Sequence, residues 1–530
     1  MGKYDYVIVG GGTAGCILAN RLTEGGKYNV LLLEAGGPPR SPWIKIPAGF
    51  SKLLTNETYN WRFESCPEAG TKERVIAIPR GKGLGGSTLI NGMIYVRGQP
   101  GDYDRWLDEG ATGWGWQNVE PYFRKLENFA EGGPSRGNSG PMYLERVKER
   151  FSISDAFLEA AAEDGQPFNE DYNEAEQEGV GYYQVTQRNG QRWSVVDGYL
   201  KPALGRDNLT VLTGSRVLRI ELEGTRCTGV TYERDGKRET VAAVGEVVLC
   251  GGTVQNPQLL ELSGIGNPDV LAKAGIEPRI ELAGVGENYI DHYATRMNWR
   301  VRNTITLNEI SRGLRLTKEV LKYFTSRKGI LTLGTGLVHG FVKTHSTLSS
   351  PDVQFFFVHA SYANAATRVL DREPGMTIGV TQLRPTSKGS IHVESADPEA
   401  APSIKPNMLA TKQDCQTLVD GMKAARRIIE QPAMRHFVEH EMTPGKEVQS
   451  DEEWLEFARE NGQTIYHPIG TCRMGGGEEA VVTPSLQVIG VENLSIADAS
   501  VIPVMVSGNT QGAVMMVAEK AADLILDRAK

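Results

Sequence analysis

The sequence predicts an α/β fold that starts with a Rossmann-like βαβ unit. A β-branched and aromatic run from Tyr4 to Val9 is typical of a buried strand. Three glycines, Gly10, Gly12 and Gly15, follow it, and apolar residues recur at helical spacing from Ala14 to Leu22. A second apolar strand, VLLLE, comes next. This order of strand, glycine turn, helix and strand is the fingerprint of a dinucleotide-binding unit.

Each glycine of this turn has a separate physical task. Gly10 allows the tight turn, Gly12 lets the backbone approach a pyrophosphate, and Gly15 lets the helix pack on the strand. The helix N-terminus then faces phosphate oxygens. Glu34, at the end of the second strand, can accept hydrogen bonds from an adenosine ribose and would repel a 2′-phosphate. The fingerprint alone leaves NAD and FAD as alternatives.

Composition sets the outer limits. A chain of 530 residues, of which 40% are hydrophobic and 23% charged, is expected to form two or three globular domains. The net charge of −8, without a basic stripe, argues against a nucleic-acid partner. Six cysteines without CxxC spacing are expected to be reduced thiols. With no signal peptide and no integral membrane segment expected, the sequence predicts a cytoplasmic enzyme of unknown oligomeric state.

The nucleotide-binding domain is expected to be assembled from separated segments. The strand, glycine turn and helix pattern returns in GEVVLCGGTVQNPQLLELSGIG, and LTVLTG begins a set of strands expected to form an antiparallel hairpin system. Residues 1–155, 210–300 and 455–530 are assigned to this domain. Residues 156–209 and 301–454 are assigned to a substrate-binding domain, with an antiparallel sheet covered by helices. The segment EGGPSRGNSGP is expected to be a surface loop or lid.

Three histidine positions have two readings each. His436 and His440 are four apart on an expected helix, a spacing compatible with a metal pair, but no third ligand group is evident. An exposed polar helix face is therefore favoured, and no metal is predicted. His359, in FFFVHA, either lines a substrate pocket or belongs to the core. The core is also favoured for most of the Phe355–Phe357 run, because alternating strand residues cannot all face one cavity.

His467 is the strongest candidate for proton chemistry. It lies between Tyr466 and Pro468 in a segment rich in glycine and proline. Asn509 lies in the turn SGNTQG directly before the last predicted helix, whose N-terminus adds positive potential. We expect His467 and Asn509 to lie close together in space.

Five ordered motifs carry a family resemblance that covers nearly the whole chain. They are VIVGGGTAGCILANRL with LLLEAG, RGKGLGGSTLINGMIYVRG, GGTVQNPQLLELSGIG, GVGENYIDH, and YHPIGTCRMG with ADASVIP and GNTQ. With these motifs the chain resembles the FAD-dependent glucose–methanol–choline (GMC) oxidoreductases, particularly bacterial choline-dehydrogenase-like and alcohol dehydrogenase members. The resemblance implies FAD as cofactor. It implies non-covalent FAD, because Ile90 stands where members with covalent FAD commonly carry a histidine.

The resemblance and the glycine turn together define an expected FAD site. Val217 would contact adenine, Asn91 to Ile94 would lie near the isoalloxazine ring, and Asp498 with Ala499 would hold the ribityl–phosphate region. The full set of expected cofactor-binding residues is Gly10, Gly12, Thr13, Ala14, Gly15, Glu34, Ala35, Trp61, Arg80, Gly81, Leu84, Gly86, Ser87, Asn91, Gly92, Met93, Ile94, Val217, Asp498, Ala499 and Thr510.

The implied reaction is the oxidation of an alcohol, expected to be primary and either aromatic or aliphatic, to an aldehyde. His467 would take the hydroxyl proton, Asn509 would donate to the same oxygen, and hydride would pass to flavin N5. Tyr466 and His359 are the candidates for substrate contact. The electrons would leave to oxygen or to another acceptor.

Four other functions remain as alternatives. A choline-type dehydrogenase would need an aromatic cage with a carboxylate, which we do not find in the sequence. A lyase relative generally has a second histidine where Asn509 stands. An NAD-linked dehydrogenase leaves the later glycine blocks without a purpose, and a non-enzymatic binding module leaves His467 unexplained.

Overall fold

The first of two large sheets forms the nucleotide-binding part of the molecule. The structure is a computed structural model that describes residues 3–364 and 369–529. The sheet runs in the order β11-β2-β1-β14-β13-β12, with β27 beside β14. Its strands are β1 (Tyr4–Val9), β2 (Val30–Glu34), β11 (Leu209–Thr213), β12 (Ser215–Glu223), β13 (Arg226–Arg234), β14 (Lys237–Leu249) and β27 (Leu494–Ile496). The predicted strands 4–9 and 30–34 are therefore confirmed.

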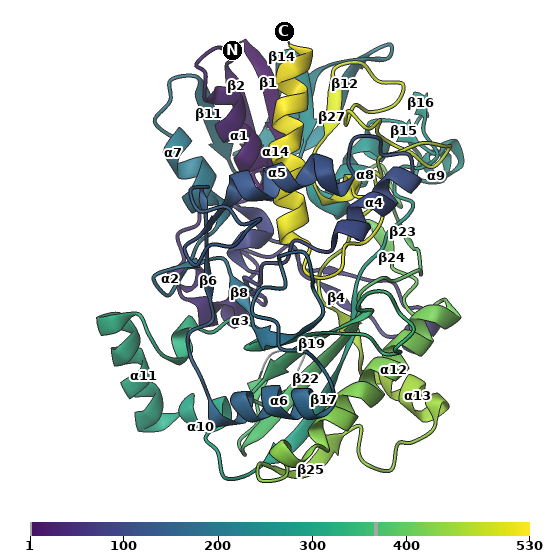
Figure 1. The fold of residues 1–530 in the computed structure, drawn as a ribbon. Helices are drawn as coiled ribbons and strands as arrows, with labels where there is room; N and C mark the ends of the chain where they lie inside the picture. Colours follow the sequence, from purple (N-terminus) through teal and green to yellow (C-terminus); the bar gives the residue numbers. More distant parts are fainter. Residues whose placement is uncertain (1–2, 365–368, 530) are drawn as a thin grey trace.

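Parallel pairing at the centre of this sheet explains its apolar strands. β1 pairs in parallel with β2 and with β14, and β27 pairs in parallel with β14. Helix α1 (Thr13–Thr23) packs on β1 and β2, and α14 (Gln511–Arg528) packs on α1, so these two helices from opposite ends of the chain are neighbours (Figure 1). Strands covered in this way are buried and read as continuous hydrophobic runs.

One strand departs from the predicted arrangement. LTVLTG was expected in an antiparallel hairpin, but β11 pairs in parallel with β2 at the edge of the sheet. The hairpin system exists beyond it, because β13 pairs antiparallel with both β12 and β14. The sequence of one strand does not show whether the neighbouring strand runs parallel or antiparallel to it. The sequence alone therefore did not distinguish parallel pairing with β2 from an antiparallel hairpin.

The second large sheet is antiparallel at every pairing of its main path, which runs β25-β17-β22-β19-β18-β7. Its strands are β7 (Gly179–Tyr182), β17 (Tyr293–Val301), β18 (Val338–Val342), β19 (Val353–Val358), β22 (Gly375–Gln382) and β25 (Val438–Thr443), and the short β26 (Gln463–Thr464) pairs with β17. The antiparallel sheet is as expected. β17 pairs here, although the expected boundary at residue 300 places it with the first domain.

Helices cover one face of the second sheet. α12 (Lys412–Ile429) packs on β22 and β19, and α6 (Ser152–Glu163) and α13 (Asp451–Asn461) pack on α12 (Figure 1). Gly421 allows this close contact, because a Cβ atom there would lie 2.8 Å from a Val380 methyl group. The other face of the sheet is directed toward the first domain and lines the cavity described below.

His436 and His440 are not on a helix, so that expectation is wrong. His440 lies on β25, and both side chains are exposed. The pairing of β25 with β17 outweighs the helical spacing of the segment. Among residues 3–364 and 369–529, no group of three His, Cys, Asp or Glu side chains could hold a metal ion.

The segment EGGPSRGNSGP is fastened by a buried side chain and is not a free lid. Arg136 donates to Glu127 at 2.9 Å and to Asp171 at 2.7 Å. Glu127 also accepts two hydrogen bonds from Arg97, which follows the second glycine block. Two arginines thus compensate the buried Glu127 carboxylate and hold its pKa below its usual value despite burial.

Candidate active site

The main cavity, of about 270 Å³, lies between the two sheets. Its floor is formed where parallel strands of the first sheet end, by Gly12 after β1, Cys250 after β14 and Asp498 after β27. Ligands of open α/β sheets bind outside the carboxyl ends of the strands. The opposite wall comes from β17, β19 and β22 of the second sheet, through Ala294, Arg296, Phe356, Val358, Thr377 and Gly379.

A second cavity, of about 100 Å³, adjoins the first. Glu34, Ala35, Trp61 and Val217 line it. The two cavities share six lining residues, which are Gly12, Gly81, Gly86, Cys250, Gly251 and Gln255. The site is therefore elongated and has two lobes, a shape that suits a dinucleotide with the pyrophosphate at the junction.

Glycines keep the junction of the two lobes open. Gly86 has a φ of +51°, and a Cβ atom on it would lie 2.8 Å from the Cα of Gly12. A Cβ atom on Gly12 would meet only the Cys250 carbonyl oxygen, at 3.9 Å, so Gly12 faces open space. Gly15 is different, because a Cβ atom there would lie 1.9 Å from the Gly10 carbonyl oxygen. Gly15 thus allows helix to pack on strand, as expected.

Most of the expected cofactor-binding residues line these two cavities. The residues in the wall of one cavity or both are Gly10, Gly12, Thr13, Ala14, Glu34, Ala35, Trp61, Arg80, Gly81, Gly86, Ser87, Asn91, Gly92, Met93, Ile94, Val217, Asp498, Ala499 and Thr510. Gly15 and Leu84 are in neither wall. Both are buried behind the glycine turn, where they support the backbone that lines the site.

Glu34 connects the glycine turn to the second glycine block. One carboxylate oxygen accepts from the backbone N–H of Gly11 at 2.7 Å, and the other accepts from Gly36 at 2.7 Å and Gly83 at 3.0 Å. Burial raises the pKa of Glu34, and these three donors oppose that shift. A carboxylate offers about four acceptor positions. Glu34 therefore has acceptor capacity left for a ribose hydroxyl in the smaller lobe.

Asp498 is held in a similar way at the other end of the site. Its carboxylate accepts from the backbone N–H of Gly252 at 2.6 Å, from the Asn256 amide at 2.8 Å and from Ser500. Burial raises its pKa. These bonds fix the backbone of residues 498–499 against the start of α8 (Gly252–Leu262).

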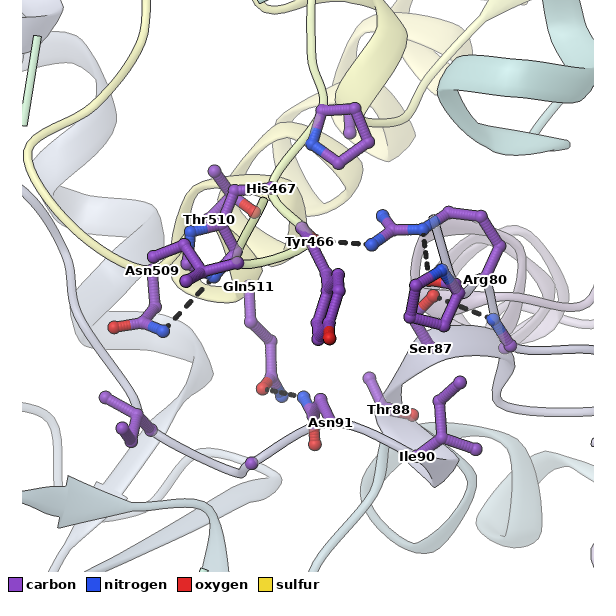
Figure 2. A pocket seen from close by; sticks show the side chains of 18 of the residues that line it. Arg80, Ser87, Thr88, Ile90, Asn91, Tyr466, His467, Asn509, Thr510 and Gln511 are labelled. Carbon is purple, nitrogen blue, oxygen red and sulfur yellow. Dashed lines mark hydrogen bonds between the residues drawn. The ribbon is translucent and has the colours of Figure 1, made fainter. Parts of the chain in front are cut away.

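The structure brings His467 and Asn509 together, as expected. The Asn509 amide nitrogen lies 3.2 Å from His467 Nε2, and both side chains line the main cavity (Figure 2). They come from two loops, one after β26 and one before α14. The aromatic ring of Tyr466 lies beside them in the cavity.

A second histidine, which the sequence did not single out, determines the tautomer of His467. His292 Nε2 lies 3.0 Å from the Leu383 carbonyl oxygen, and His292 Nδ1 lies 3.0 Å from His467 Nδ1. A carbonyl only accepts, so His292 Nε2 carries the proton and His292 Nδ1 is an acceptor. His467 Nδ1 must then donate. The proton-free nitrogen of His467 is Nε2, the one that faces the cavity.

The opposite end of this chain of hydrogen bonds gives the same answer. Gln354 donates from its amide nitrogen to the Asn509 side-chain oxygen at 3.2 Å. The Asn509 amide nitrogen is thereby turned toward His467 Nε2, which must accept. Two independent partners thus leave His467 Nε2 as a lone-pair acceptor.

Burial keeps both imidazoles neutral. Desolvation lowers the pKa of His467 well below its usual value, and the nearby His292 and Arg80 lower it further. Desolvation also lowers the pKa of His292 to about 4. Asp291 supports the loop, because it accepts from the His467 backbone N–H at 2.8 Å and from the Tyr289 hydroxyl at 3.0 Å. Burial raises the pKa of Asp291 to about 6.

The two candidate substrate contacts have different outcomes. Tyr466 lines the cavity. The Tyr466 backbone has a φ of +74°, and its carbonyl oxygen accepts a hydrogen bond from Arg80 at 2.5 Å. His359 does not line the cavity, so that candidate is wrong. It is fully buried and stacks on Phe151, with ring centroids 3.7 Å apart. The strand period explains this, because Phe356 and Val358 face the cavity and the intervening side chains face the core.

Arg296 is a further cavity residue that the sequence did not single out. The Gln463 amide oxygen accepts from its guanidinium when that amide is turned to satisfy both groups. Among the described residues, Asp498 is the only acidic residue that lines the main cavity, and its carboxylate already accepts hydrogen bonds from three residues. The wall formed by the second sheet therefore has a cationic and apolar character.

Buried polar atoms of the C-terminal segment fit a cofactor at this place. Gln511 accepts from the Asn91 amide at 2.6 Å, while its own amide nitrogen is buried without a partner in the described protein. Buried Arg192 holds Asn91 through its side-chain oxygen at 2.5 Å and its carbonyl oxygen at 2.8 Å. An unpartnered donor on a residue of the cavity wall, beside a fixed glycine block, suits a flavin ring, which the protein orients through hydrogen bonds.

Comparison with known proteins decides the family. Sequence profiles of the N- and C-terminal parts of the GMC oxidoreductases match residues 4–294 and 385–518. The chain is a GMC oxidoreductase. GMC oxidoreductases bind FAD and oxidise alcohols, so the family and cofactor expected from the motifs are confirmed.

Individual relatives support this assignment. Mitochondrial choline dehydrogenase of Mus musculus is 40% identical and covers 99% of this chain and 89% of its own. Alcohol dehydrogenase [acceptor] of Pseudomonas putida is 38% identical and covers 99% of this chain and 96% of its own. Among solved structures, pyridoxine 4-oxidase from Mesorbium loti has a TM-score of 0.89 at 31% identity, over 98% of this chain and 99% of its own.

The space above Gly12 provides a test of the FAD site. We expect Gly12→Val to lower FAD affinity by about tenfold to a hundredfold, because its side chain occupies the junction of the two lobes. Flavin absorbance of the purified protein measures retention, and circular dichroism measures folding. Gly25→Val, at a glycine with nothing within 4 Å of its Cβ position, is the matched control. Full flavin content in Gly12→Val would contradict the placement.

Proposed function

We propose that this GMC oxidoreductase oxidises a primary alcohol to an aldehyde, with His467 as the base. The observation that carries the proposal is the tautomer of His467, whose Nε2 lone pair faces the cavity. An alcohol gives up hydride readily only as its oxygen loses a proton. A neutral imidazole with a lone pair toward the substrate can accept that proton.

Asn509 orients the alcohol and stabilises the developing charge on its oxygen. Its amide nitrogen is aimed at His467 Nε2 by Gln354, so an oxygen that binds at this point meets a donor and an acceptor together. The proton that reaches Nε2 makes His467 cationic. Its Nδ1–H stays bonded to His292, which spreads the positive charge along the chain of hydrogen bonds.

FAD, when bound, supplies the two-electron acceptor for the alcohol carbon. The glycine block from Gly81 to Ile94 and the residues 498–499 would hold it. We propose that the attachment is non-covalent, because Ile90 offers no nucleophile where it lines the cavity. Oxygen and an artificial acceptor are both suitable for a first assay, because the apolar Ile465 beside the site does not decide between them.

Choline is the second candidate substrate, since the similarity to choline dehydrogenase of Mus musculus favours it. The chemistry of the cavity opposes it. A quaternary ammonium ion is held by aromatic rings together with negative charge. The cavity does contain aromatic rings, Phe356 and Tyr466 among them. Arg296 places a positive charge on the wall formed by the second sheet, however, and no carboxylate among the described residues lies on that wall. We therefore propose an uncharged alcohol with an apolar or aromatic body.

Substitution of His467 tests the proposed base. His467→Ala is expected to slow alcohol-dependent flavin reduction by at least about a hundredfold while FAD stays bound. Stopped-flow absorbance measures the rate, and the flavin spectrum measures retention. His440→Ala removes an exposed imidazole on β25 and is the matched control. A rate in His467→Ala close to that of the control would refute the assignment.

His292 is proposed as a positioning residue that acts through His467. His292→Leu removes the acceptor of the His467 Nδ1 proton and is expected to slow flavin reduction by at least about tenfold. It also removes both the nearest titratable neighbour of His467 and the acceptor of its Nδ1 proton, so the acidic limb of the pH–rate profile should shift. His292→Gln keeps an acceptor oxygen and should restore part of the rate. An unchanged pH profile in His292→Leu would argue for a purely structural role.

Substrate charge can be tested at Arg296. Benzyl alcohol is expected to reduce the flavin, whereas choline at the same concentration should not. Arg296→Glu reverses the charge on the cavity wall and should raise kcat/KM for choline relative to benzyl alcohol by at least about tenfold. Arg219→Glu, at an exposed arginine on β12, is the control. Rapid reduction of the wild-type flavin by choline would overturn this part of the proposal.

A further inference from the structure

Helix α11 (Gly313–Ser326) stands at the edge of the molecule, beside the second domain (Figure 1). Only one side of it is packed. Tyr323 belongs to the core of the second domain, and Leu316 and Val320 are half-buried against that core. The remaining faces of this helix are directed away from the core.

The outer side of α11 carries a stripe of large apolar residues. Leu314, Leu321 and Phe324 are 82%, 64% and 61% exposed, more than any other large apolar side chain in the described ranges. Spacings of seven and three residues place them along one face of a helix. An exposed apolar patch of this kind marks an interaction site, because a free surface would not normally hold it in water.

Positive charge lies next to this stripe. Residues 312–328 contain six basic residues and one acidic residue, in a chain whose net charge is −8. Carboxylates outside the segment pair with two of the six, Glu309 with Arg315 and Glu149 with Lys322, which leaves the surface cationic. The local charge is thus opposite to that of the whole chain.

The same helix is connected to the wall of the main cavity. Arg312, directly before α11, donates to the carbonyl oxygens of Leu370 and Asp371. Leu370 is paired with Tyr362 in the two-stranded sheet of β20 (Tyr362–Asn364) and β21 (Val369–Leu370). Tyr362 lines the cavity. Two contacts, Arg312 with Leu370 and Leu370 with Tyr362, therefore connect the start of the helix to the cavity wall.

We propose that α11 docks the protein on a bilayer surface that contains anionic phospholipids. A helix with an apolar stripe beside cationic residues lies in the interface, with its apolar side in the acyl boundary and its cations at the headgroups. The alternative occupant, a second protein surface, would need acidic groups beside an apolar groove. In the described ranges no helix is long and apolar enough to cross a membrane, so docking here is peripheral. The expected cytoplasmic location stays a prediction.

Docking has a consequence that rests on the proposed function. The cavity wall at Tyr362 would be held near the lipid, where alcohols with apolar bodies concentrate. Docking itself does not depend on that function, because vesicle binding is measured without substrate.

Sedimentation with vesicles tests the proposal on the FAD-loaded full chain. The wild type is expected to bind vesicles of phosphatidylcholine with phosphatidylglycerol, and to bind phosphatidylcholine alone more weakly. The triple variant L314Q/L321Q/F324Q should bind the anionic vesicles at least about tenfold more weakly, because it loses its apolar contacts. The matched control F168Q/L204Q/V244Q removes three exposed apolar side chains from other elements and should bind like the wild type.

Charge is tested separately. K318E/K322E should weaken binding to the anionic vesicles more than to the neutral ones, whereas K148E/K237E should not. Flavin absorbance and circular dichroism should be the same in all these variants, which shows that each is folded and loaded with FAD. Absence of wild-type binding, or equal binding by the α11 triple variant, would overturn the proposal. So would a wild-type dimer in light scattering that L314Q/L321Q/F324Q converts to a monomer, because the stripe would then be a contact between copies.

Discussion

The proposed chemistry of this site depends on one directional chain of hydrogen bonds, from the Leu383 carbonyl through His292, His467 and Asn509 to Gln354. Its two ends are an obligatory acceptor and an amide, and they leave a single consistent arrangement of protons. No carboxylate is a member of this chain. The ring of His467, the proposed base, is therefore oriented by neutral groups, while the Asp291 carboxylate accepts from its backbone N–H, and burial keeps the imidazole neutral.

The chain of hydrogen bonds also explains the use of two sheets. Leu383 follows β22 and Gln354 lies on β19, so the second sheet positions both ends of the chain. The glycine turn and the segment at residues 498–499 belong to the first sheet. The second sheet thus orients the proposed proton acceptor, whereas the first sheet would hold the cofactor. Substrate specificity can vary on the inner face of the second sheet without disturbing the nucleotide site.

The parts that could be predicted are those with local signals. The βαβ start is encoded in consecutive residues, and the pairing of His467 with Asn509 followed from recognisable motifs. His292 was visible in GVGENYIDH, but its partner is 175 positions away and nothing local identifies it. Gln354 contacts Asn509 across 155 positions. His359 was misplaced because the strand phase decides which side chains reach the cavity, and a run of aromatic residues hides that phase.

The two-lobed cavity has a consequence for biosynthesis. Its walls combine the glycine turn near residue 12, the block near residue 86, the start of α8 and the segment 498–511. The first of these is translated almost five hundred residues before the last. A nascent chain therefore lacks a complete flavin site until its end has left the ribosome, and loading of the prosthetic group must be a late, post-translational event.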